Sequence, residues 1–170
     1  KKEYHFDKLK AGINLLPHCR NTLKQKVYCV LHASKLTDPN QIDCTVSIMA
    51  PIALENTLGV EANFVMMTKG RSDPNKMNAV WSQALKRGEK IYIYSVNIRR
   101  NLWLQTTLLQ NNVTWKTSDV SLISSPKTDI PLDTSFVNVD QLGRELLLKL
   151  DYCYTANSYH EICVYCSYWI

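Results

Sequence analysis

The sequence lacks the motifs on which most enzymes and nucleotide-binding sites are built. Its five glycines stand singly, so no glycine-rich loop is present to cradle a phosphate. No G-x-S-x-G elbow places a nucleophile on a sharp turn, and no D-x-D or H-E-x-x-H array offers ligands to a catalytic metal. We therefore expect no enzymatic activity, no cofactor, no metal and no small-molecule substrate.

Long hydrophobic runs and low-complexity segments are also missing. No apolar run approaches the roughly 18 residues of a membrane span. An apolar fraction of 45% and a charged fraction of 21% are ordinary for a globular protein, and no linker rich in Gly, Ser or Pro divides the chain. The sequence predicts one β-rich domain over residues 1–170.

What the sequence does contain is period-two alternation of apolar and polar residues between turn residues, which is typical of half-buried strands. Cys44, Val46 and Ile48 alternate with polar neighbours, and 91–98 is apolar on both faces, as in a central strand. Expected strands cover 25–35, 43–48, 60–67, 91–98, 102–109, 113–118, 120–124 and 135–139. The predicted fold is mainly β (a β-rich α+β fold is the variant), a two-layer sandwich of about 8–10 strands with one or two helices.

The clearest alternation lies at the end of the sequence. Leu146, Leu148 and Leu150 share one face, and after a turn over 155–160 the pattern resumes from Ile162 to residue 170. We expect a long terminal hairpin. A helix over 141–150, capped by Asp140, is the competing interpretation.

One helix is predicted over 74–87. Asp73 offers a cap, Pro74 suits the first helical position, and Gly88 suits a left-handed stop. Trp81 is the largest apolar residue on the expected buried stripe, so we expect Trp81→Ala to destabilise the fold by about 3–5 kcal/mol. The opposite side of this helix would carry cations.

Positive charge is concentrated around this segment. Residues 69–100 hold eight basic and two acidic residues, a local net charge of +6 in a chain of +5. Segregated positive charge is typical of a surface that meets nucleic acid, anionic lipid headgroups or an acidic protein, although it is often just a solvated face. The predicted anion-binding residues are Lys69, Arg71, Lys76, Lys86, Arg87, Lys90, Arg99 and Arg100.

The segment 163–170 contains no charged residue, proline or glycine. A strand of this kind would aggregate at an exposed sheet edge, so it is either central in the sheet or covered by a second subunit. Burial within the monomer is the favoured interpretation. If a second subunit covers the strand instead, we expect Tyr165 and Trp169 to mediate self-association into a homo-oligomer.

Six cysteines leave the redox compartment open. Zinc ligand types occur at 160, 163, 166 and 153, and again at 18, 19, 29 and 32, but residues three apart on a flat strand point to opposite faces, which disfavours both sets. A disulfide between Cys153 and Cys163 is an alternative to free thiols. Cys29 and Cys44 fit a strand interior, which favours an intracellular location over secretion with Asn112 glycosylated.

In general character, small, β-rich and basic, the sequence resembles the matrix-type structural proteins of enveloped RNA viruses. The resemblance implies self-association and attachment to membrane headgroups or nucleocapsid through the basic face, in the cell or the virion. Two other hypotheses remain open: a secreted, disulfide-stapled sandwich that binds a host or ligand protein, and a sequence-independent nucleic-acid-binding protein.

Overall fold

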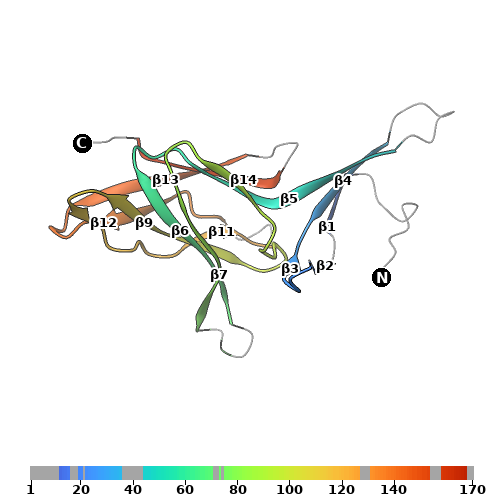
Figure 1. Ribbon diagram of the computed structural model, residues 1–170, viewed down its shortest axis with the longest axis horizontal. Helices are drawn as coiled ribbons and strands as arrows, with labels where there is room; N and C mark the ends of the chain where they lie inside the picture. The colour runs from blue at the N-terminus through green and yellow to red at the C-terminus, as the bar shows by residue number, and fades with distance from the viewer. Residues whose placement is uncertain are drawn as a thin grey trace.

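The structure is a computed structural model that describes residues 12–15, 19–20, 22–35, 44–70, 73, 75–126, 131–153 and 158–167. Throughout these ranges the chain is built of strands, with no helix, and two sheets pack face to face (Figure 1). The predicted mainly β sandwich is therefore confirmed. Within the same ranges, no helix is long and apolar enough to cross a membrane.

In the described part of the chain, seven strands form the larger sheet, in the order β1-β4-β5-β14-β13-β12, with β8 also paired to β5. The pairing of β14 with β5 is parallel, and the other pairings are antiparallel. Figure 1 shows β4 and β5 extending together beyond the body of the molecule. The bounds are β1 Gly12–Leu15, β4 Val30–Lys35, β5 Cys44–Asn56, β8 Lys90–Ile93, β12 Ser135–Val139, β13 Glu145–Cys153 and β14 Ser158–Tyr165.

The second sheet has five strands among the described residues, in the order β10-β9-β6-β7, with β11 also paired to β9. The strands of a short hairpin, β2 and β3, pair with each other and, among the described strands, with neither sheet. The bounds are β2 Cys19–Arg20, β3 Lys26–Val27, β6 Glu61–Lys69, β7 Met77–Leu85, β9 Leu102–Gln110, β10 Val113–Thr114 and β11 Ser121–Ser124.

Alternation places one side of the longer strands in a shared core. Leu54 and Ile162 from the larger sheet, and Phe64 and Leu104 from the smaller one, are fully buried between the layers. Their neighbours in sequence face outward, as the period of two requires. Burial of such side chains stabilises the fold by roughly 1.5–3 kcal/mol each.

A buried amide links the strands at one end of the sandwich. Asn56 Nδ2 donates to the carbonyl oxygens of Leu85 at 2.8 Å and Val60 at 3.0 Å, and its Oδ1 accepts from the N–H of Leu58 at 3.0 Å. Its backbone also bonds Gly88 and Glu89. The end of β5 is thereby tied to the turn that follows β7.

The predicted helix over 74–87 is wrong, because residues 77–85 form strand β7. Trp81 and Leu85 are four residues apart, a spacing that fits one face of a strand as well as one face of a helix. Pairing with β6 decides between them: Trp81 lies opposite Met66, and Leu85 opposite Ala62. Gly88 does adopt a left-handed conformation, with φ of 73°, in the turn between β7 and β8.

Of two further strand predictions, one is confirmed and one is wrong. The terminal hairpin is confirmed, since β13 and β14 pair antiparallel, and the helix over 141–150 is excluded. The central strand over 91–98 is wrong: β8 ends at Ile93 and, among the described strands, pairs only with β5. Its second face, with Tyr92 and Tyr94, is exposed rather than buried.

Candidate functional site

Strand β7 forms one edge of the smaller sheet. Among the described strands only β6 pairs with it, so its other edge leaves backbone N–H and C=O groups without a strand partner there. The strand contains no charge, proline or glycine, the devices that usually block such an edge. Met66 lies opposite Trp81 and Met67 opposite Ala79, which makes Val80 the extra residue of a β-bulge.

Beside this edge lies a groove between β7, β8 and the β2–β3 hairpin. It comprises two hollows of about 440 and 630 Å³ that share Lys26, Val80 and Ser95. Val80, Tyr92 and Tyr94 are 37%, 40% and 39% exposed, so apolar surface stands open to solvent along it. We call this the β7–β8 groove; its lining also includes Tyr28, Trp81, Ile93, Asn97, Arg100 and Leu102.

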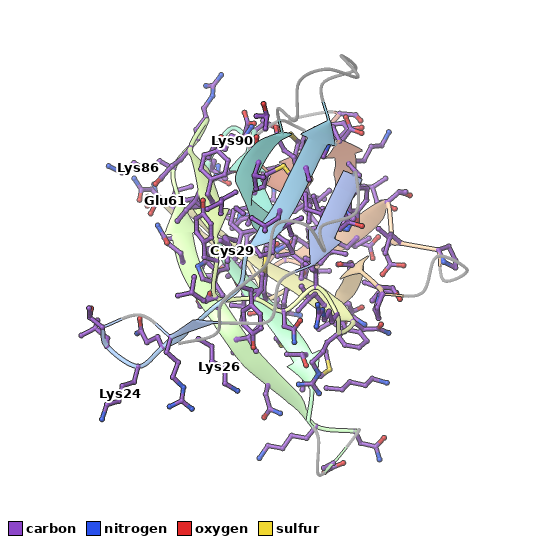
Figure 2. The ribbon with its side chains drawn as sticks, turned by 90° about the vertical axis from the view of Figure 1, so that its right-hand side faces the viewer. Lys24, Lys26, Cys29, Glu61, Lys86 and Lys90 are labelled. Atoms are coloured by element: carbon purple, nitrogen blue, oxygen red, sulfur yellow. The ribbon has the colours of Figure 1, made fainter. Side chains whose placement is uncertain are left out.

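The β2–β3 hairpin closes one side of the groove. Its turn places Lys24 at a φ of 59°. The chain that follows is bonded to the residue just after β8, because the N–H of Tyr28 donates to the carbonyl of Tyr94 at 2.7 Å. Figure 2 shows Lys24 and Lys26 on this hairpin, with Lys86 and Lys90 well apart from them. The groove therefore has a basic side chain, Lys26, in its wall.

The predicted anion-binding residues do not form one patch. Lys69, Lys76, Arg99 and Arg100 gather where β6 meets β7: Arg100 donates to the carbonyl of Lys69 at 2.9 Å, and Lys69 lies 5.6 Å from the Trp103 ring. Lys86, Arg87 and Lys90 lie at the other end of β7, about 27 Å away along a strand of this length. Arg71 lies outside the described residues. The basic face expected on one helix is therefore divided between two ends of one strand.

Lys90 is engaged within the fold. Its Nζ pairs with Glu161 Oε1 and lies 3.9 Å from Glu55 Oε2. The hydrogen bond to Glu161 raises the pKa of Lys90, against the opposing effect of burial. An external anion at Lys90 would have to compete with the two carboxylates that already face its ammonium group, and the predicted role of Lys90 in anion binding stays a prediction.

The zinc ligand types at 153, 160, 163 and 166 do not come together as one site, and the second set, at 18, 19, 29 and 32, is not tested because it includes His18. His160 and Cys163 lie on opposite faces of this strand because they are an odd number of residues apart. Burial lowers the pKa of His160 and raises that of Cys163 to about 11. Cys153 and Cys163 are free thiols, and Cys153 lies opposite Glu161 instead, so the disulfide between them is absent. His18 lies outside the described residues.

The β7–β8 groove was not predicted from the sequence, in which Trp81 fits a helix interior, and Tyr92 and Tyr94 fit a central strand. One signal in the sequence could have indicated it. Residues 77–85 form a nine-residue run without charge, flanked by cations, and such a run is as typical of a sheet edge that binds a peptide as of a helix.

Together, the two-layer β architecture and the open edge beside an apolar groove define a β-sandwich module suited to binding another protein chain. Comparison with known families agrees. Residues 18–170 match the family of the vacuolar-sorting associated protein 13 adaptor binding domain. Because the match covers most of the chain, the chain belongs to this family. No curated protein matches it.

Family membership corrects the matrix-like hypothesis. The match is to an adaptor binding domain, not to a viral matrix protein, and it gives no support to nucleic-acid binding, membrane attachment or a homo-oligomer. The argument for self-association through β14 also fails, because β14 is bonded on both edges, by β13 and by β5. Tyr165 is half-buried there, and Trp169 lies outside the described residues. Of the partners expected from the sequence, the family match supports a protein partner.

Proposed function

We propose that this chain binds an extended segment of an adaptor protein, which adds a strand to the open edge of β7. The observation that carries the proposal is the uncharged edge of β7 lying against the β7–β8 groove. Strand addition to a sheet edge gives affinity through backbone hydrogen bonds, and neighbouring pockets give specificity by receiving alternate side chains. The family description, an adaptor binding domain, supports a partner of this class.

The groove indicates which side chains the segment carries. Val80, Trp81 and the tyrosines of β8 offer apolar and aromatic contacts, which suit proline or aliphatic side chains of the segment. Lys26 and Arg100 line the hollow nearer the β6–β7 tip, which suits a carboxylate or a backbone carbonyl. In this proposal the chain works by binding alone and catalyses no reaction. An intracellular location remains a prediction.

A random-peptide library displayed on phage provides the test. Peptides selected on the intact chain are synthesised, and their affinity is measured by fluorescence anisotropy for the chain and its variants. Val80→Lys places a charge at the bulge of the open edge and should weaken binding at least tenfold. That loss corresponds to about 1.4 kcal/mol, a modest requirement for a blocked edge.

Val137→Lys is the matched control. Val137 is 36% exposed against 37% for Val80, and it lies on β12, which pairs only with β13 among the described strands. The proposal expects Val137→Lys to bind the selected peptides as the parent does. Equal affinities in all three proteins would place the binding site elsewhere, and failure to select any peptide would remove strand addition as the mode of binding.

A further inference from the structure

A second cluster of reactive side chains lies on the outer face of the larger sheet. Strand register aligns Asp151, Cys163, Glu55 and Lys90 in one row across β13, β14, β5 and β8. The next row of the same face begins with Cys153 opposite Glu161. Side chains in neighbouring rows of one face are close enough to share a ligand.

Three of these residues bring metal-ligand atoms together. A carboxylate oxygen of Glu55, one of Glu161 and the Sγ of Cys163 all lie within 4.8 Å of one another. Cys163 Sγ is 3.8 Å from Glu55 Oε2. Two ligand atoms of a tetrahedral zinc ion are about 3.3–3.8 Å apart, given zinc bonds of about 2.0–2.3 Å, so this spacing needs little adjustment.

The cluster also has an unmet demand for a cation. The side chain of Glu161 is only 8% exposed, and its Oε2 is buried with no hydrogen-bond partner. Lys90 contacts only the other oxygen of Glu161, Oε1, and its single ammonium group faces the carboxylates of both Glu55 and Glu161. A buried carboxylate oxygen without a donor destabilises the fold unless a ligand supplies the missing contact.

We propose that Glu55, Glu161 and Cys163 form a zinc site, with Cys153 supplying the fourth ligand. Zinc is favoured over calcium or magnesium because the set includes thiols, which hard cations avoid. Lys90 leaves when zinc binds: its side chain is 30% exposed, so the ammonium can turn to solvent while the metal takes its place between the carboxylates. The bound ion joins β13, β14 and β5 across the sheet face.

Zinc binding at this site must release the proton of the Cys163 thiol. Burial and the neighbouring Glu55 raise the pKa of this thiol to about 11, and burial also raises the pKa of Cys153.

Titration of the reduced, metal-free chain with Zn²⁺ against a chromophoric chelator measures the affinity, and Co²⁺ gives a second readout through its thiolate charge-transfer absorption. The proposal expects the charge-transfer band in the parent and its loss in Cys163→Ser and Glu161→Gln. Cys29→Ser should retain the band, because Cys29 is placed away from Lys90 (Figure 2). Lys90→Gln should bind Zn²⁺ more tightly, since it removes the competing cation.

Absence of the band and of Zn²⁺ competition in the parent would overturn the proposal. Binding that survives both Cys163→Ser and Glu161→Gln would do the same, because it would locate the metal on other cysteines. Glu55→Gln covers the case in which Glu161→Gln fails to fold, since Glu55 is more exposed and its loss should still weaken Zn²⁺ binding. These outcomes are independent of peptide binding at the β7–β8 groove.

Discussion

Strands β14 and β7 each contain an uncharged run, but they occupy opposite positions in their sheets. Residues 163–165 of β14 and all of β7 lack charge, proline and glycine, and both strands carry aromatic residues. β14 is bonded by β13 on one edge and β5 on the other, whereas β7 is bonded only by β6 among the described strands. An uncharged run therefore indicates that the edges of its strand are covered, but it does not identify what covers them. For β14 the cover is the chain itself, and for β7 we propose an adaptor.

The same charge introduced into each strand tests this contrast most severely. Val164 in β14 is fully buried, whereas Ala84 in β7 is exposed. Val164→Asp should lower the free energy of unfolding by more than about 4 kcal/mol, because it buries an unpaired charge. Ala84→Asp should change it by less than about 0.5 kcal/mol. Urea unfolding followed by circular dichroism gives both values; similar losses in the two variants would contradict the assignment of β7 as an open edge.

Trp81→Ala should have an intermediate effect. The side chain packs against the core but is partly exposed at the sheet edge, so the loss should be about 1–2 kcal/mol rather than the 3–5 kcal/mol of a fully buried aromatic residue. Phe64→Ala, at a fully buried position of β6, is the reference for the larger value. If the two variants lost equal stability, Trp81 would be a core residue and not part of the groove.

The turns beside the two strands offer a finer comparison. Asp140, in the turn before β13, is buried, and accepts hydrogen bonds from the N–H groups of Leu142 and Arg144 and from Arg144 Nε at 2.8, 2.9 and 2.6 Å. In the turn after β7, the partly exposed Glu89 accepts one such bond from the N–H of Lys86. Burial by itself raises the pKa of Asp140, but the bonds from Arg144 and Leu142 leave that pKa below its usual value.

Because the folded-state pKa of Asp140 is the lower one, its contribution to stability is present above the unfolded-state pKa of about 3.9 and disappears as pH falls through the folded value. Asp140→Asn should therefore remove part of the acid sensitivity of unfolding. Urea midpoints of the variant and the parent, measured from neutral pH down to about pH 2, give this comparison. Parallel curves for Asp140→Asn and the parent would show that the turn does not depend on the charge.

Period-two alternation was sufficient to predict most of the strands and the terminal hairpin, because each such strand buries one face. It failed at β7, where Trp81 and Leu85 fit both periods and only pairing with β6 decides. It also failed to place the groove and the Glu55–Glu161–Cys163 cluster. These sites depend on which strands become neighbours, and the parallel pairing of β14 with β5 joins segments about a hundred residues apart.

The smallest expected effect on stability is that of Val80→Lys, the variant that should matter most for binding. As the extra residue of the bulge, Val80 is not opposite a partner on β6, and its side chain is partly exposed. A lysine there can extend into solvent, so the free energy of unfolding should change by less than about 0.5 kcal/mol, as for Val137→Lys on β12. Urea unfolding of both variants provides the comparison. A loss above about 2 kcal/mol for Val80→Lys alone would mean that the outer edge of β7 is packed within the fold. Strand β7 would then be covered by the chain itself, as β14 is, and would not be open to an adaptor.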